Sequence, residues 1–163
     1  MAMKPGVVLL VALVLVGCGG RQAAFETPTR NAALYPGETP RIRALIDQYA
    51  VVHDIPPALL HRVIQRESDY RPDARNGPYW GMMQILPQTA GTMGHSGPAE
   101  ELLDPEVTLQ YAGRYLRGAW LVSDGDIDAA VGWYARGYYF EARNRCLLVE
   151  TRLAAREVAG HCR

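Results

Sequence analysis

The spacing of apolar residues predicts a helical domain from Thr39 to the end of the chain. Thr39 and Pro40 are typical of a helix cap and a first-turn proline, and an apolar stripe at helical spacing follows them. The stripe consists of Ile42, Leu45, Ile46 and Tyr49. Pro56 and Pro57 open a second predicted helix, which should end before Pro72, because a proline disfavours helical geometry at the residue that precedes it.

Further helices are predicted along the second half of the chain. Pro87 can start a short helix, and Asp104 can cap a longer one. The longer helix has a stripe of small and large residues: Leu109, Ala112, Gly113, Leu116 and Ala119. Asp126 or Asp128 can cap the next helix, and a final helix is expected over residues 147–158.

The predicted fold class is therefore mainly α. No segment alternates like a long strand, although residues 79–85 could form a short hairpin. A chain of 163 residues, 48% of them hydrophobic, suits one compact domain, and we expect a monomer. Its 17 basic and 17 acidic residues leave no excess of positive charge, so we expect no nucleic-acid partner.

The first eighteen residues resemble a targeting signal. Lys4 precedes an apolar run over residues 7–16, which ends directly before Gly17 and Cys18. The run is shorter than the ~20 apolar residues of a membrane-spanning helix and fits the ~7–15 residues of a cleavable secretion signal. Its end resembles the signal of bacterial lipoproteins, which is cut before a cysteine that carries the lipid. The alternative is a plain secretion signal in which Cys18 has no role.

These features divide the chain into three expected parts. They are a signal peptide over residues 1–17, the lipidated Cys18 with a flexible tether over 18–38, and the domain over 39–163. The tether is rich in Gly, Ala, Thr and Pro and has no apolar period. Lipid chains would anchor the protein in the bacterial cell envelope. Gly19 would follow the lipidated cysteine, and in this it resembles lipoproteins that are sorted to the outer membrane. We therefore expect the anchor in the outer membrane, with the domain facing the periplasm.

The second predicted helix carries an acidic residue on its apolar face. Four residues fall at positions i, i+3, i+4 and i+7 of this face: Leu60, Val63, Ile64 and Glu67. Partial burial raises the pKa of a carboxyl group, which keeps a proton available for general acid catalysis. The alternative is a structural ion pair between Glu67 and an arginine such as Arg71 or Arg75.

Five short motifs occur in order along the domain. They are Glu67-Ser68 with Pro72, Gly81-Met82-Met83-Gln84 with Pro87, Leu103-Asp104-Pro105 with Gly113, Trp133-Tyr134-Ala135-Arg136-Gly137, and Glu150-Thr151-Arg152. Together they resemble the transglycosylase domain of the soluble-lytic-transglycosylase superfamily, which has a lysozyme-like fold. The resemblance extends from about residue 42 to residue 158.

The resemblance implies roles for several residues. Glu67 would be the sole catalytic carboxylate, with Ser68 as its hydrogen-bonding neighbour. Met83 and Gln84 would line the cleft, and Tyr134 would lie close to Glu67. Gln84 can donate and accept hydrogen bonds, which suits an N-acetyl group. The implied substrate-binding residues are Ser68, Gly81, Met83, Gln84 and Tyr134.

The resemblance also implies a reaction and a partner. The family cleaves the bond between N-acetylmuramic acid and N-acetylglucosamine in peptidoglycan strands without water and leaves a 1,6-anhydro sugar. Glu67 would act first as acid and then as base. A lysozyme-like hydrolase is the alternative if Asp69 or Asp73 supplies a second carboxylate. A catalytically silent peptidoglycan-binding lipoprotein is another, since Ala135 replaces the family asparagine.

The remaining ligand-type residues predict no metal and no cofactor. The four histidines show no ligand spacing on a common face, and we find no cysteine pair near them. Cys146 and Cys162 could pair in an oxidising periplasm. A helix over residues 147–158 would, however, hold its ends ~17 Å apart, and a disulfide needs Cα atoms within ~7 Å. We therefore expect these cysteines to stay apart unless that helix is broken.

Overall fold

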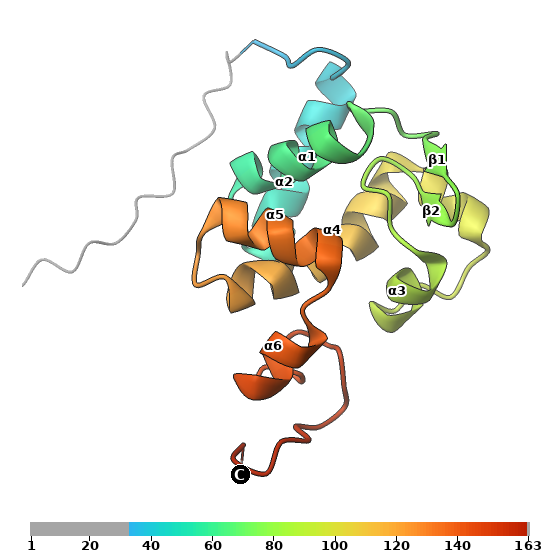
Figure 1. Ribbon diagram of the computed structural model, residues 1–163. Helices are drawn as coiled ribbons and strands as arrows, with labels where there is room; N and C mark the ends of the chain where they lie inside the picture. The colour runs from blue at the N-terminus through green and yellow to red at the C-terminus, as the bar shows by residue number, and fades with distance from the viewer. Residues whose placement is uncertain (1–32, 163) are drawn as a thin grey trace, which may run out of the picture.

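The computed structural model of the protein describes residues 33–162, which fold mainly into helices (Figure 1). The helices are α1 (Pro40–His53), α2 (Pro57–Ser68), α3 (Pro87–Thr92), α4 (Pro105–Val122), α5 (Ile127–Arg136), α6 (Tyr139–Asn144) and the short 3-10 helix η1 (Ala99–Leu103). The strands β1 (Arg75–Asn76) and β2 (Tyr79–Trp80) pair as an antiparallel hairpin. The mainly α fold class is confirmed. A short hairpin is present, but it covers residues 75–80 rather than the expected 79–85, where a single bridge joins Trp80 and Ile85.

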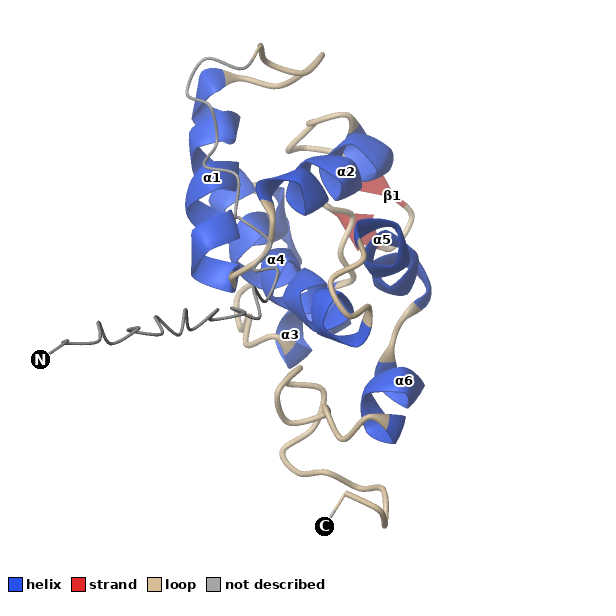
Figure 2. Ribbon diagram, turned by 90° about the vertical axis from the view of Figure 1, so that its left-hand side faces the viewer, coloured by secondary structure: helices blue, strands red, loops and turns tan. Residues whose placement is uncertain are grey.

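The helices pack around α4, the longest of them. α1, α3, α5 and η1 all contact α4, and α2 packs against α1 and α5 (Figures 1 and 2). The predicted stripe of α4 is fully buried, with Leu109, Ala112, Leu116 and Ala119 at 0% exposure. In both views α6 and the residues after it lie at one end of the molecule, beyond the packed helices.

Side-chain caps start three of these helices where the sequence predicts them. The Thr39 hydroxyl accepts a hydrogen bond from the Ile42 N–H, and the Asp104 carboxylate accepts two from the first turn of α4. Asp126, rather than Asp128, caps α5 by accepting a hydrogen bond from the Ala129 N–H at 2.7 Å. Each cap satisfies a backbone donor that has no partner within its helix.

The compact structure begins a few residues before Thr39. The Glu38 side chain is fully buried and accepts two hydrogen bonds from the Arg43 guanidinium, both at 2.6 Å. The Tyr35 ring stacks on Tyr70, the second residue after α2. The segment expected to be the end of a tether is therefore packed against the domain from position 35.

The expected signal over residues 1–17 and the expected lipid attachment at Cys18 lie outside the described residues. Of the helices within residues 33–162, none combines the length and the apolar character that crossing a bilayer requires.

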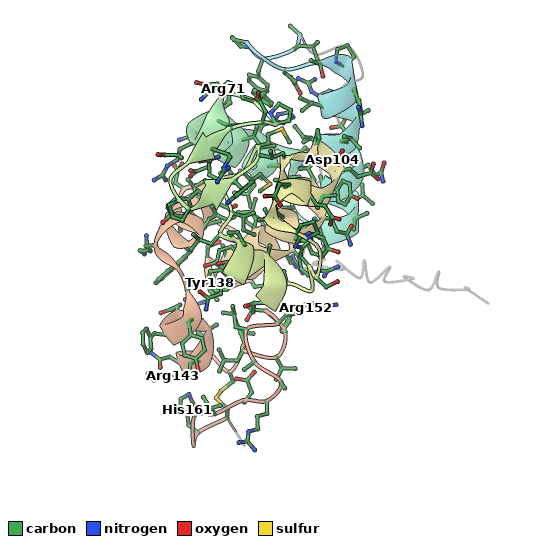
Figure 3. The ribbon with its side chains drawn as sticks, turned by 90° about the vertical axis from the view of Figure 1, so that its right-hand side faces the viewer. Arg71, Asp104, Tyr138, Arg143, Arg152 and His161 are labelled. Atoms are coloured by element: carbon green, nitrogen blue, oxygen red, sulfur yellow. A yellow bond between two sulfur atoms is a disulfide. The ribbon has the colours of Figure 1, made fainter. Side chains whose placement is uncertain are left out.

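The expected final helix over residues 147–158 is wrong. Instead α6 ends at Asn144, and the chain continues in turns, because Cys146 and Arg152 both adopt left-handed backbone conformations. The Thr151 hydroxyl donates to the Leu147 carbonyl oxygen at 2.6 Å and holds one of these turns. Figure 3 shows this extension, from Arg143 to His161, at the end of the molecule below Tyr138.

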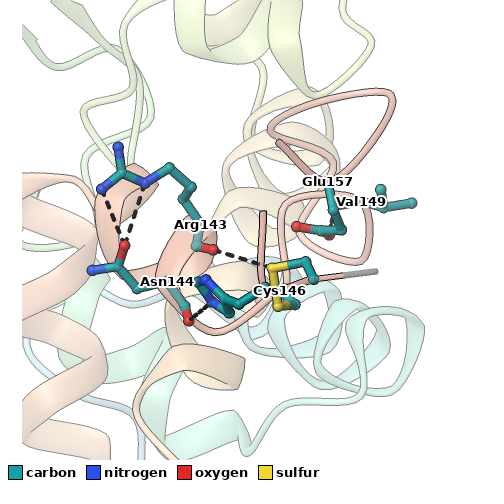
Figure 4. Close-up of a disulfide and its surroundings, with 7 residues drawn as sticks. Arg143, Asn144, Cys146, Val149 and Glu157 are labelled. Carbon is teal, nitrogen blue, oxygen red and sulfur yellow. Dashed lines mark hydrogen bonds between the residues drawn. A yellow bond between two sulfur atoms is a disulfide. The ribbon is translucent and has the colours of Figure 1, made fainter. Parts of the chain in front are cut away.

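The two cysteines of the extension form a disulfide, contrary to our expectation (Figure 4). The Cα atoms of Cys146 and Cys162 are 5.4 Å apart, a separation that a continuous intervening helix would not allow. Within residues 147–158, Leu148 is the only apolar residue that is fully buried. A helix in this segment would therefore gain little stability from apolar burial relative to the loop that the disulfide closes.

The disulfide creates one cluster that was not predicted from the sequence. The side chain of His161 lies within 4.8 Å of the sulfur atoms of Cys146 and Cys162. Because both sulfur atoms are bonded to each other, they do not offer thiolates to a metal ion.

Candidate active site

The end of α2 carries Glu67 to the surface of the core. Leu60, Val63 and Ile64 on the same face are fully buried, whereas the Glu67 side chain keeps 22% of its surface exposed. The helix stops one residue later, since Asp69 adopts a left-handed conformation with φ of 51°. Glu67 therefore stands in the last turn of α2, as its spacing predicted, half-buried beside an opening.

Burial raises the pKa of the Glu67 carboxyl group, and the cation of Arg66 partly opposes this effect. The Arg66 Nε lies 3.7 Å from a Glu67 carboxylate oxygen. The two arginines named as structural partners are engaged elsewhere, since Arg71 donates to a backbone carbonyl and Arg75 stacks on an aromatic ring. The suggested structural ion pair with Arg71 or Arg75 is thus not formed.

A tight turn over residues 80–85 forms the wall opposite Glu67. Trp80 and Ile85 exchange two backbone hydrogen bonds across it, each 3.0 Å long. Gly81 adopts φ of 73°, and a Cβ atom there would overlap the carbonyl oxygen of Leu102. Gly81 therefore has a structural role, because only glycine fits both this conformation and this close approach.

Two helices hold consecutive carbonyl groups of this turn. The Ser68 hydroxyl of α2 donates to the Met82 carbonyl oxygen at 2.7 Å, and the Tyr134 hydroxyl of α5 donates to the Met83 carbonyl oxygen at 2.8 Å. Ser68 is buried and positions the turn, and we find no hydrogen bond from it to Glu67 among the described residues. Our expectation for Ser68 is corrected accordingly.

Met83 also differs from its expected place. Its side chain is fully buried in the core, and it does not line the cavities beside Glu67. The residue contributes its backbone carbonyl, which holds Tyr134. Met82 and Met83 are both fully buried, as expected for apolar side chains, whereas the polar Gln84 remains at the opening.

The Gln84 side chain lines the opening with a restricted hydrogen-bonding capacity. Its amide nitrogen donates to the carbonyl oxygens of Ala74 and Gly81, at 3.1 and 2.9 Å. Both amide N–H groups are thereby used. Gln84 can therefore accept a hydrogen bond from a ligand, such as one from an N-acetyl N–H group, but has no donor left for it.

Tyr134 forms the buried wall beside Glu67. Burial raises the pKa of its phenol well above the ordinary value, and the nearby charge of Glu67 adds to this effect. The Tyr134 hydroxyl consequently stays protonated and keeps its hydrogen bond to the turn. It acts as a fixed neutral surface rather than as a base.

Two adjoining cavities open along this wall. The larger, of about 350 Å³, contains Glu67 and is lined by Arg66, Glu67, Asn76, Tyr79, Gln84, Tyr134 and Ala135. The smaller, of about 260 Å³, is lined by Tyr79, Gln84, Ile85, Leu86, Thr89, Tyr115, Tyr134, Ala135, Arg136 and Gly137. They share four lining residues, Tyr79, Gln84, Tyr134 and Ala135, so the two cavities are direct neighbours.

Asn76 and Arg136 line the cavities but were not predicted from the sequence. Asn76 precedes Gly77, and an Asn-Gly pair is a strong hairpin signal, which could have placed Asn76 at a turn facing the cleft. Arg136 falls in the last turn of α5, next to the residue that replaces the family asparagine. The position of Arg136 in that turn does not indicate, from the sequence alone, which cavity its side chain lines.

Comparison with known families agrees with this site. The model of the transglycosylase SLT domain matches residues 44–145, well over half of the chain. The chain belongs to this family. Membership of this family supports a lysozyme-like fold and indicates a lytic transglycosylase-like activity on peptidoglycan. The match contains Glu67 and both cavities and ends directly before the disulfide-closed extension. No solved structure matches the chain.

Two glycines of the SLT domain provide a matched test of the turn opposite Glu67. Gly81→Ala should destabilise the domain by about 2–5 kcal/mol, because a left-handed alanine costs ~1–2 kcal/mol and the overlap with Leu102 adds ~1–3 kcal/mol. Gly77→Ala, at φ of 58° with open space around it, should cost only about 1–2 kcal/mol. Urea unfolding of both variants measures the difference, and equal losses would contradict the packing argument.

The charge of Arg66 provides a test of the Glu67 environment. Arg66→Gln removes a cation that favours the ionised carboxylate, so the pKa of Glu67 should rise further above its ordinary value. The carboxyl carbon signal of Glu67, followed by NMR across a pH titration, measures this shift. Arg62→Gln, on the exposed side of α2 and paired with Asp128, should leave the titration unchanged. A pKa of Glu67 that falls in Arg66→Gln would contradict the argument.

Proposed function

We propose that this SLT-domain protein is a lytic transglycosylase that uses Glu67 as its single catalytic carboxyl group. The observation that supports this is that Glu67 is the one carboxylate among the described residues that line the two cavities. The raised pKa of Glu67 suits a group that must hold a proton before the reaction and release it during the reaction.

In the proposed reaction the protonated Glu67 first gives its proton to the glycosidic oxygen between N-acetylmuramic acid and N-acetylglucosamine. The bond from this oxygen to the anomeric carbon breaks, and the oxygen leaves as the 4-hydroxyl of N-acetylglucosamine. The ionised Glu67 then accepts the proton of the muramoyl 6-hydroxyl as that oxygen bonds to the anomeric carbon. The product is a 1,6-anhydro end, and no water is consumed.

The acidic residues nearest to Glu67 in the sequence do not favour a two-carboxylate hydrolase. Asp69 caps the end of α2 and is exposed, and Asp73 is exposed in the following turn. Neither lines the cavity of Glu67. Because ordinary glycosidases flank the scissile bond with two carboxyl groups, the arrangement supports the intramolecular reaction of the muramoyl 6-hydroxyl.

Ala135, which stands where the family has an asparagine, lines both cavities. Ala135 is exposed there and offers no hydrogen bond from its side chain. Side-chain amides at the larger cavity come from Asn76 and Gln84 instead. Asn76 can donate and accept hydrogen bonds to a sugar, whereas Gln84 can only accept them.

We also propose that Cys18 carries the lipid that anchors the enzyme to the outer membrane, with the domain in the periplasm. The support is the charged Lys4, the short apolar run and the small residue before Cys18. Tyr35, seventeen positions after Cys18, is the first residue within 33–162 whose ring packs against the domain. The intervening chain could span the distance between the membrane and the glycan strands.

Glu67→Gln should abolish the formation of anhydro products from purified peptidoglycan. The full-length protein in detergent and the variant are incubated with peptidoglycan, and mass spectrometry identifies the released muropeptides. Anhydro-muramoyl ends from the wild type alone support the proposal. Reducing ends would instead indicate a hydrolase, and glycan binding without any product would indicate a silent binding protein.

The stability of Glu67→Gln serves as the control for this experiment. The folded protein raises the pKa of Glu67, so the contribution of this group to stability is full at low pH and is lost as pH rises through the folded-state pKa. Replacing it by the neutral glutamine should therefore not lower the melting temperature at pH 7. A variant that is inactive and equally stable has lost chemistry rather than its fold.

Cys18→Ser should prevent lipid attachment. Metabolic labelling with a fatty acid in a bacterial host, followed by phase separation in detergent, should place the wild type in the detergent phase and the variant in the aqueous phase. Labelling that persists in Cys18→Ser would contradict the proposed anchor.

A further inference from the structure

The guanidinium group of Arg136 is held in place at the edge of the smaller cavity. Its Cζ atom lies 3.9 Å from the centre of the Trp133 ring, one turn earlier on α5. A Cβ atom on Gly132 would approach the Arg136 Nη1 to 2.6 Å, so the glycine leaves the room that the guanidinium occupies. The side chain is thus folded back over the last turn of the helix.

Arg136 has no protein partner of opposite charge within residues 33–162. Arg66, which lines the larger cavity, lies 3.7 Å from Glu67, but we find no carboxylate in ion-pair contact with Arg136 in the described part of the chain. Residue Arg136 is exposed, and its guanidinium stacks on Trp133. A guanidinium offers five N–H donors in a planar fork that matches a carboxylate, so this group is available to an anionic ligand.

The cavity that Arg136 lines adjoins the cavity of Glu67, the catalytic carboxyl group of the proposed function. Glu67 borders the larger cavity and Arg136 the smaller, and the shared wall includes Tyr134 and Ala135. Ala135 is the residue directly before Arg136, and it lines both cavities. A sugar chain that presents a scissile bond to Glu67 can therefore extend towards Arg136.

In the glycan strands of peptidoglycan, only one of the two alternating sugars carries anionic groups. N-acetylglucosamine is neutral, whereas N-acetylmuramic acid carries a lactyl group that ends in a carboxylate or in a peptide with carboxylates of its own. We propose that Arg136 binds a carboxylate carried by the muramoyl lactyl substituent and thereby selects anionic strands. This inference rests on the proposed function for the identity of the strand.

The position of Arg136 at the end of α5 also has a purely structural explanation. A cation in the last turn of a helix interacts favourably with the helix dipole, and stacking on Trp133 adds to this. Such a role would change stability but would not distinguish a charged substrate from a neutral one. The test therefore compares ligands that differ only in charge.

Three soluble glycan probes separate the sources of the carboxylate. The first carries stem peptides, the second has been stripped by an amidase to the free lactyl carboxylate, and the third is the stripped strand converted to its neutral methyl amide. Binding is measured by calorimetry with the full-length protein carrying Glu67→Gln, so that no probe is cut. Cleavage is measured separately with active protein.

Arg136→Gln should weaken binding of carboxylate-bearing probes about five- to tenfold, the range expected for one charge-assisted hydrogen-bonded contact open to solvent. Arg136→Lys should retain part of this affinity, since it keeps the charge but loses the fork. Arg143→Gln is the matched control, because Arg143 also stacks on an aromatic ring, that of Phe140, but does not line either cavity. It should bind all probes as the parent does.

The pattern across the probes decides the proposal. A loss confined to the peptide-bearing probe assigns the peptide carboxylates, and a loss confined to the stripped probe assigns the lactyl carboxylate. An equal loss on the neutral methyl amide, or no loss at all, overturns the proposal. The wild type could cleave no probe while Arg136→Gln still weakens binding of the charged probes alone. That result would reject the proposed reaction and leave this inference in place.

Discussion

Two hydrogen bonds to consecutive backbone carbonyls determine the shape of the site. The hydroxyls of Ser68 and Tyr134 hold the Met82 and Met83 carbonyl oxygens, at 2.7 and 2.8 Å, and so fasten α2 and α5 to the same turn. Both donors are buried, where an unsatisfied carbonyl group would be costly. Because the catalytic candidate Glu67 directly precedes Ser68, the same constraint places it beside Tyr134.

The burial that builds the core also prepares the chemistry of the site. The apolar face of α2 draws Glu67 towards the interior, and this burial raises the pKa of its carboxyl group, with Arg66 partly opposing the rise. Tyr134 is buried by the same packing and stays protonated. Packing and proton availability in this SLT domain therefore have one physical cause, which is the exclusion of water from the end of α2.

The segment beyond the SLT domain is stabilised in a different way. It contributes one fully buried leucine, Leu148, to the core and is closed by the Cys146–Cys162 disulfide. A crosslink limits the freedom of the unfolded loop and so replaces apolar burial that this short segment does not provide. No residue of this extension lines either of the two cavities.

Elements that depend on local interactions could be predicted from the order of residues alone. Helical periodicity placed Glu67 on the apolar face of α2, and the capping residues placed the starts of α1, α4 and α5, because each interaction lies within a few residues. Which side chains contact one another depends instead on how the helices and turns pack. This packing turned the Met83 side chain into the core, used both amide donors of Gln84, brought Arg136 to the cavity and joined the cysteines in place of a helix. These outcomes depend on backbone carbonyls and on segments far apart in the chain, and neither leaves a periodic signal in the sequence.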